Sequence, residues 1–169
     1  MSLSRYAAVL IWETMISLVY IDNGTQHEDL ELFFFGETRT CDSYFLALDS
    51  GLMPEDESSQ KVAAVLNSLI RQWIDLSVHA TDGQTIYLPF DFSDQCTGCL
   101  RCKFSEDTVT VTLGNSYIEG YSHRASDVSS FSRSINDFEP APVDCPSHTL
   151  PRIEFEQILW QIASQVRAA

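Results

Sequence analysis

Basic residues are scarce in this sequence. Its 169 residues include 10 lysines and arginines against 24 aspartates and glutamates, which gives a formal net charge of −14. A surface of that sign repels phosphate, so the composition argues against nonspecific binding to nucleic acid or to anionic lipid. Any charged partner is therefore expected to be a basic protein. A large net charge also keeps a small protein soluble, which is the alternative explanation of the same excess.

The acidic excess is concentrated at the beginning of the chain. Residues 1–60 hold eleven acidic and two basic side chains, residues 61–125 hold seven and five, and residues 126–169 hold six and three. The first third therefore carries most of the negative field, and we expect it to contribute most to any contact with a basic partner.

A long hydrophobic run and a secretory signal are also missing. The most apolar stretch, residues 6–21, is interrupted by Glu13 and Ser17. It falls short of the roughly 20 apolar residues that span a bilayer, and it has no signal-peptide cleavage pattern. We therefore expect a cytoplasmic protein that does not enter a membrane. The five cysteines, an odd number, are then expected to be reduced thiols.

Catalytic and nucleotide-binding motifs are absent too. None of the four histidines lies in a G-x-S-x-G or H-E-x-x-H context, and there is no glycine-rich phosphate loop. His123 lies near Tyr121, Arg124, Ser126 and Asp127, which could build an acid–base site, although a polar loop offers the same residues by chance. A cysteine hydrolase is a further alternative. We expect no enzyme activity and no cofactor.

The most conspicuous motif is a run of three cysteines, Cys96, Cys99 and Cys102, with a distant Cys145 followed by proline. The C-x2-C-x2-C spacing is typical of thiolate ligands to zinc or to an iron–sulfur cluster. In a ferredoxin-type run the Cys-Pro pair follows closely, whereas here it lies 43 residues further on. On a strand, Cys99 and Cys102 also point to opposite faces. We therefore expect no metal, and a metal or redox protein remains the alternative function.

Hydrophobic periodicity predicts an α+β fold, with residues 1–169 in a single domain. We expect an antiparallel meander of about four to six strands packed by two amphipathic helices. One helix is predicted from Pro54 or Ser59 to His79, and the other from Arg152 to Arg167. Each has one apolar stripe at helical spacing. The stripes are Val62, Val65, Leu66, Leu69, Trp73 and Leu76 in the first helix, and Phe155, Ile158, Leu159, Ile162, Ala163 and Val166 in the second.

Alternation of apolar and polar residues predicts the strands. Residues 5–21 are apolar on both faces and are expected to form a central strand covered on both sides, although their first half could be helical. Further strands are expected at residues 29–35 and 44–48. The sheet is centred on residues 84–121, where four strands follow one another.

Two predictions concern the end of this sheet region. Gly114-Asn115 is a two-residue hairpin signal, which predicts a last strand at residues 117–121. The Ser- and Pro-rich segment 122–151 is expected to be a long loop that wraps the body and is anchored by Phe131 and Phe138.

The polar face of the predicted sheet, together with the acidic first third, is the candidate binding surface. Tyrosines set among charges are typical of the residues that dominate protein interfaces. The candidate partner-binding residues are Glu28, Asp29, Glu31, Glu37, Tyr87, Asp91, Tyr117, Glu119 and Tyr121.

The last third of the chain resembles bacterial immunity proteins. The resemblance lies in the run Tyr117-Ile118-Glu119-Gly120-Tyr121-Ser122-His123, the Ser-rich loop that reaches Asp137-Phe138, and the closing amphipathic helix. Such proteins neutralise polymorphic toxins delivered by contact-dependent or type VI secretion systems. The resemblance implies a protein that inhibits a cognate toxin by occluding its active site. An adaptor subunit of a larger assembly shares the same surface features and is a further alternative.

Overall fold

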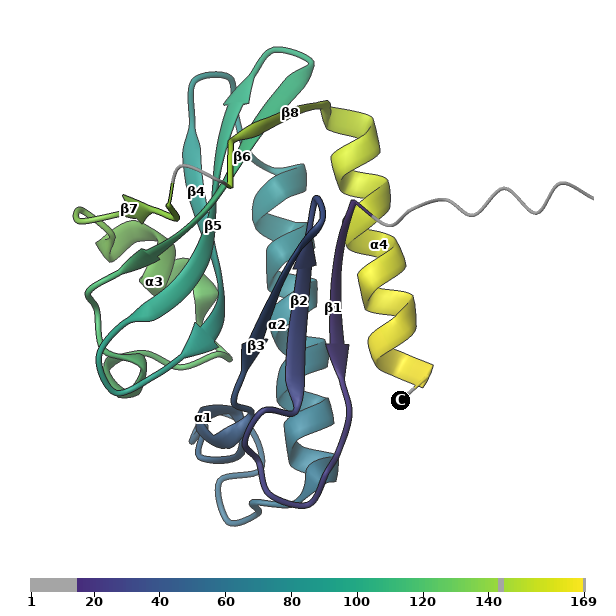
Figure 1. Cartoon of the computed structure of the whole chain (residues 1–169), viewed down its shortest axis with the longest axis vertical. Helices are drawn as coiled ribbons and strands as arrows, with labels where there is room; N and C mark the ends of the chain where they lie inside the picture. Colours follow the sequence, from purple (N-terminus) through teal and green to yellow (C-terminus); the bar gives the residue numbers. More distant parts are fainter. Residues whose placement is uncertain (1–14, 143–144, 169) are drawn as a thin grey trace, which may run out of the picture.

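The computed structural model describes residues 15–142 and 145–168 of the chain (Figure 1). The described strands form two antiparallel sheets, one of three strands and one of five, and helices pack against both. The predicted α+β class, with antiparallel pairing and two long helices, is confirmed. The division of the strands between two sheets was not apparent from the periodicity.

The three-stranded sheet has the order β1 (Ile16–Tyr20), β2 (Leu30–Phe34), β3 (Glu37–Cys41). Its inner face buries alternate apolar side chains, among them Leu18 and Leu32, which are direct partners in register. Among the described strands β1 pairs only with β2, and Val19 on its outer face is 40% exposed. The prediction of a central strand covered on both faces is therefore wrong for β1, and residues 5–14 lie outside the described residues.

The five-stranded sheet is built on a meander of three long strands, β4 (Thr85–Phe92), β5 (Thr97–Ser105) and β6 (Thr108–Ser116). Two short strands, β7 (Glu139–Pro140) and β8 (His148–Pro151), both pair antiparallel with β6. One face of this sheet enters the core through Leu88, Leu100 and Val111. The predicted sequence of strands from residue 85 to residue 113 is confirmed.

The two long helices, α2 (Ser59–Val78) and α4 (Arg152–Ala168), pack against each other, and α4 also packs against β1 (Figure 1). Ser58 caps α2, because its side chain accepts a hydrogen bond from the backbone N–H of Lys61 (3.3 Å). The acidic triplet 55–57 therefore lies before the helix, not in its first turn. Both predicted apolar stripes are buried, apart from the half-buried Leu76.

Arg152 connects the start of α4 to the end of α2. Its guanidinium donates hydrogen bonds to the carbonyl oxygens of Ser77 (2.9 Å), Val78 (2.8 Å) and Ala80 (2.9 Å). These carbonyls form the negative end of the α2 dipole, so a cation is favourable there. The contact fixes the two helices side by side.

Residues 44–48, predicted as a strand, instead contain a single helical turn, α1 (Tyr44–Ala47). Tyr44 and Leu48 are exposed while Leu46 and Ala47 are buried, which is the burial pattern of a helical turn. The prediction is wrong because periodicity cannot separate helix from strand in so short an apolar run.

Residues 117–121, predicted as a strand after a turn at Gly114, do not form one. β6 continues through Gly114, and the chain then enters the 3-10 helix η1 (Gly120–Ser122). A Cβ on Gly114 would lie 2.3 Å from the carbonyl oxygen of Glu139 and 2.4 Å from the ring of Phe138. Gly114 therefore permits the close approach of β7, and its interpretation as a hairpin turn is wrong.

The described parts of the segment 122–151, residues 122–142 and 145–151, lie against the body, but they carry the helix α3 (Val128–Ser134) as well as β7 and β8, so the expectation of a long loop is wrong in part. α3 packs against β4 and α2. Phe131 is fully buried, and the ring of Phe138 lies 5.6 Å from that of Tyr87. The predicted anchoring of this segment by Phe131 and Phe138 is confirmed.

Candidate partner-binding surface

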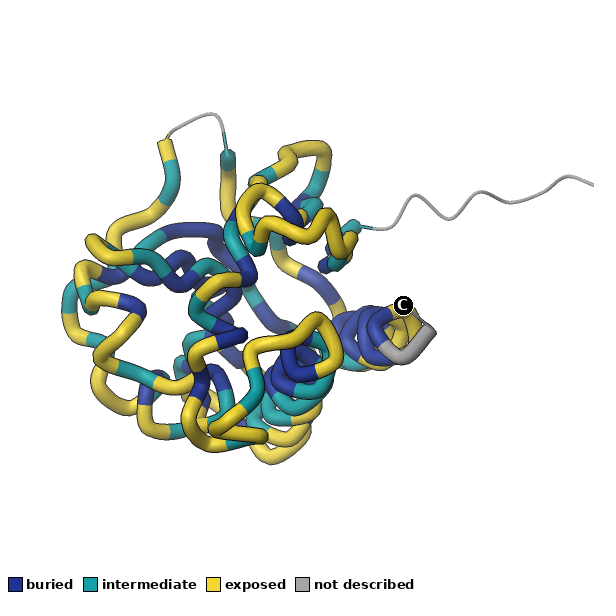
Figure 2. Tube along the Cα trace, turned by 90° about the horizontal axis from the view of Figure 1, so that it is seen from below, coloured by how far each residue is buried: buried dark blue, intermediate teal, exposed yellow. Residues whose placement is uncertain are grey.

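Four loop segments meet toward the lower end of the molecule in Figure 1, the side from which Figure 2 is viewed. We call them the acidic loop end: residues 21–29, 42–57, 93–96 and 117–127. The first two segments are joined by Gln26, whose Nε2 donates a hydrogen bond to the carbonyl oxygen of Glu57 (2.8 Å). Much of the chain on this side is exposed loop (Figure 2).

Further hydrogen bonds connect the other segments. The N–H of Gly120 donates to the carbonyl oxygen of Ser93 (2.7 Å), which joins the third segment to the fourth. The N–H and Oγ of Ser126 donate to the two carboxylate oxygens of Asp49 (2.9 and 2.8 Å), which joins the fourth segment to the second. The four loops therefore form one continuous surface.

The charge of this surface is almost entirely negative. Its segments contain no lysine and a single arginine, Arg124. All of its acidic residues except Asp29 and Asp49 are at least partly exposed. At physiological ionic strength charges interact over about 8 Å, so neighbouring carboxylates on joined loops add their fields. The acidic residues are Asp22, Glu28, Asp29, Asp42, Asp49, Glu55, Asp56, Glu57, Asp94, Glu119 and Asp127.

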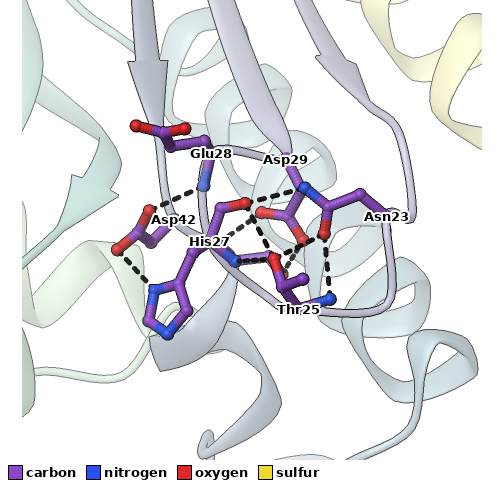
Figure 3. Close-up of polar contacts among 7 residues, drawn as sticks. Asn23, Thr25, His27, Glu28, Asp29 and Asp42 are labelled. Atoms are coloured by element: carbon purple, nitrogen blue, oxygen red, sulfur yellow. Dashed lines mark hydrogen bonds and ion pairs between the residues drawn. The ribbon is translucent and has the colours of Figure 1, made fainter.

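Figure 3 shows how the loop between β1 and β2 is held in place. The N–H of Thr25 donates to Asn23 Oδ1 (2.9 Å), and Asn23 Nδ2 donates to the carbonyl oxygen of His27 (2.8 Å). The N–H of Glu28 donates to Asp42 Oδ1 (2.8 Å), and His27 Nδ1 lies 2.9 Å from Asp42 Oδ2. The carboxylate of Glu28 points away from this network (Figure 3). It is therefore free to meet a partner.

The contact between His27 and Asp42 also changes how both groups titrate. The hydrogen bond to the carboxylate raises the pKa of His27, because it favours the charged imidazolium. Burial alone would raise the pKa of Asp42, but the hydrogen bonds from His27 and from the N–H of Glu28 outweigh burial and lower that pKa. Asp42 is therefore held as a carboxylate at the base of the loop.

Asp29, a predicted binding residue, is buried, with 3% of its surface exposed. Its Oδ1 accepts a hydrogen bond from the N–H of Ser43 (2.8 Å), and its Oδ2 accepts one from Ser43 Oγ (2.7 Å). Ser43 precedes α1, so the carboxylate ties the start of α1 to the start of β2. The expectation that Asp29 faces a partner is therefore wrong, and its role is to order the loops from inside.

Tyr117 and Tyr121 are the most exposed aromatic side chains of the surface, at 65% and 62%. The hydroxyl of Tyr117 donates to the carboxylate of Glu139, and that of Tyr121 donates to the carboxylate of Glu119. These hydrogen bonds raise the pKa of both tyrosines, because a neighbouring carboxylate disfavours the phenolate. Each ring is therefore presented beside a negative charge.

The sheet face predicted to bind a partner is largely covered by the chain itself. The ring of Phe138 packs on Tyr87, and the Cζ of Arg101 lies 4.6 Å from the centre of the same ring. Thr112 is buried, and its Oγ1 lies 2.8 Å from Ser147 Oγ. The expectation of an open face is therefore wrong there, because Phe138 and Ser147 lie against it, and Tyr87 is only partly accessible.

Asp91 lies between the two sheets and faces Arg39 of β3, with its Oδ2 4.0 Å from Arg39 Nε. Burial raises the pKa of Asp91, and the charge of Arg39 opposes that rise. Gly98 leaves room for this pair, because a Cβ there would lie 2.8 Å from Asp91 Cβ and 3.3 Å from Arg39 Nη1. Asp91 therefore connects the sheets and is not part of an open binding face, contrary to prediction.

The remaining two predicted residues are exposed but lie elsewhere. Glu31 is on the outer face of the three-stranded sheet, opposite Val19 of β1. Glu37 begins β3, at the opposite end of that strand from Asp42. The nine predicted residues therefore do not form one face. Those that lie at the acidic loop end with exposed side chains are Glu28, Tyr117, Glu119 and Tyr121.

Four of the five cysteines lie outside the acidic loop end, and Cys96, which is half-buried, belongs to its segment 93–96. Cys99 and Cys102 are both buried on opposite faces of β5. Burial raises the pKa of Cys99 to about 12 and also raises that of Cys102. Thiols in this state are protonated at neutral pH, which disfavours metal binding and nucleophilic attack. Within residues 15–142 and 145–168, no three His, Cys, Asp or Glu side chains are placed to hold a metal ion.

Several residues of the acidic loop end were not predicted from the sequence, including Tyr44, Leu48 and Asp94. Polar loop residues adjoin all three, because Tyr44 follows Ser43, Leu48 precedes Asp49-Ser50-Gly51 and Asp94 follows Ser93. The sequence did not indicate at which end of the sheet each loop lies, because this depends on the number and direction of the preceding strands. The misassigned strand at residues 44–48 shifted that count.

Comparisons with protein-family models, with curated proteins and with solved structures found no match. In the described part of the chain, no helix combines the length and the apolar character needed to cross a membrane.

Proposed function

We propose that this protein is an immunity protein that acts in the bacterial cytoplasm and inhibits a cognate basic toxin domain by binding it through the acidic loop end. The main support is the gathering of exposed carboxylates on four joined loops, which contain Arg124 as their single basic residue. A protein that binds nucleic acid needs a basic cleft, and an acidic inhibitor can occupy that cleft in place of phosphates. Inhibition would then be by occlusion, without chemistry.

Exposed aromatic and apolar side chains support the same surface. Tyr44, Leu48, Tyr117 and Tyr121 are all exposed at the acidic loop end. Tyrosines among charged groups are typical of the few residues that carry most of the binding energy of an interface. Charge would then set the association rate, and these side chains would set the lifetime of the complex.

The order of the loops supports tight binding. Their segments are joined by hydrogen bonds from Gln26, Gly120 and Ser126, and by the buried carboxylate of Asp29. A surface that is ordered before binding loses little conformational entropy when the complex forms.

The five cysteines are free thiols, as a reducing cytoplasm would maintain them.

The test begins with capture of the partner from the native cell with the tagged full-length chain. Association is then measured by stopped-flow fluorescence at low and high salt for the variant Glu28→Lys, Asp94→Lys, Glu119→Lys. We expect association to be at least about tenfold slower at low salt, with a weaker salt dependence, because the steering field is lost. If the partner is a toxin, wild-type protein should also rescue growth when the two are co-expressed.

The matched control reverses three exposed acids at the other end of the molecule, as Glu37→Lys, Glu106→Lys and Asp107→Lys. Both variants change the net charge equally, so only the position of the charges differs. The control should associate at nearly the wild-type rate. Equal slowing in both variants would contradict binding through the acidic loop end, and a captured partner without toxicity would contradict the immunity function.

A further inference from the structure

A pocket of about 270 Å³ opens within the acidic loop end, between α1 and the segment that follows β6. Pockets that hold drug-sized ligands usually measure roughly 300–1,000 Å³, so this one is small. It is suited to a single side chain. Its walls include the apolar side chains of Phe45, Leu48 and Phe92.

Two titratable groups of the pocket wall, Asp49 and His123, are engaged in contacts within the chain. The carboxylate of Asp49 is already compensated by hydrogen bonds from Gly51 and from Ser126, at distances of 2.7 to 2.9 Å. The ring of His123 packs edge-on against Phe131 at 5.2 Å, and burial lowers the pKa of His123, so the imidazole is neutral at pH 7. The carboxylate of Asp49 therefore has its oxygens occupied by donors of the chain itself and is poorly placed to bind a guest.

Arg124 is the one cation that lines the pocket. It is exposed and makes no ion pair within the described residues. Its charge disfavours a lysine or arginine guest, while the surrounding carboxylates and the apolar walls disfavour an acidic one. An aromatic ring meets both conditions, because it is uncharged and its face attracts a guanidinium.

We propose that this pocket receives one aromatic side chain of the bound partner, with its ring between the apolar wall and Arg124. The origin of that side chain in a protein partner rests on the function proposed above, whereas the preference of the pocket for an aromatic ring does not. Aromatic anchors that fill pockets are the commonest centres of binding energy in protein interfaces.

Side-chain analogues test the chemistry of the pocket directly. The ¹⁵N-labelled full-length chain is titrated with p-cresol, n-butylguanidinium and propionate, and amide chemical shifts are followed by NMR. We expect p-cresol to shift the amides of Ser50, Gly120 and Ala125 saturably, with a dissociation constant on the order of 1–10 mM. Absence of saturable shifts with p-cresol, or stronger binding of either charged analogue, would overturn the proposal.

A filled pocket provides the matched variant. Ser50 lines the pocket and is exposed, so Ser50→Trp places a ring in the opening without disturbing the core. It should abolish the p-cresol shifts, while Ser59→Trp, an exposed change on α2, should retain them. Well-dispersed spectra would show that both variants fold. Persistence of the shifts in Ser50→Trp would refute the assignment of the pocket, whatever the outcome of the charge-reversal experiment. A failed charge-reversal experiment would contradict the proposed function and would leave the preference of the pocket for an aromatic ring unaffected.

Discussion

Asp29 is a buried acidic side chain of the acidic loop end, and we expect its loss to destabilise the fold. Its carboxylate is the buried acceptor for both the N–H and the hydroxyl of Ser43. Asp29→Ala leaves these donors without their partner, so we expect the free energy of unfolding to fall by about 1–3 kcal/mol. Urea denaturation with an unchanged m-value measures this. Glu31→Ala, on the exposed face of the adjoining strand β2, should change the free energy of unfolding by less than about 0.5 kcal/mol.

The contrast between these two acids shows what single residues reveal in a sequence. Asp29 and Glu31 have the same side-chain direction by alternation, and both were predicted to be exposed. They differ because Ser43, 14 residues further on, returns to cover Asp29. A contact of that range depends on the hairpin between the two segments and has no local signature. Glu28, in contrast, follows the Asn23-Gly24 turn signal and is exposed as predicted, whereas Glu119 is exposed although the strand predicted around it does not form.

At the level of elements, long periodic segments were predictable and short ones were not. The apolar stripes of α2 and α4 repeat over several turns, and β4 to β6 alternate over eight or nine residues each. The turn α1 has only four residues, which is too few for a period to appear. Gly114 was misinterpreted as a turn residue. A glycine is required there because β7 approaches closely, and β7 lies 25 residues further along the sequence.

The contact between the two sheets predicts a pH effect on stability. Burial raises the pKa of Asp91 in the folded protein, although Arg39 opposes the rise. The contribution of this carboxyl group to stability is therefore greatest below its ordinary pKa of about 3.9 and is lost as the pH rises through the folded value. Asparagine does not ionise, so the Asp91→Asn variant does not lose stability in this way as the pH rises. We expect the stability of Asp91→Asn relative to wild type to increase from about pH 3 to about pH 7.

Urea denaturation at several pH values measures this difference, and Arg39→Met supplies the comparison. Without the guanidinium the pKa of Asp91 should rise further, because the opposing charge is gone. The gain from Asp91→Asn at neutral pH should then be larger in the Arg39→Met background. A gain that is independent of pH, or smaller in that background, would contradict a carboxyl group dominated by burial.

On the scale of the whole molecule, charge and hydrogen bonding predict where a partner leaves its footprint. The acidic loop end holds eleven acidic residues and a single arginine, whereas α4 begins at the opposite end of the molecule, where Arg152 joins it to α2 (Figure 1). In the complex with the captured partner, hydrogen exchange should slow in residues 21–29, 42–57, 93–96 and 117–127, because binding suppresses the local opening of exposed loops. Exchange in residues 152–168 should stay unchanged. Protection centred on the outer face of β1 to β3, or on α4, would place the partner elsewhere and leave the acidic loop end as a surface that only keeps the protein soluble.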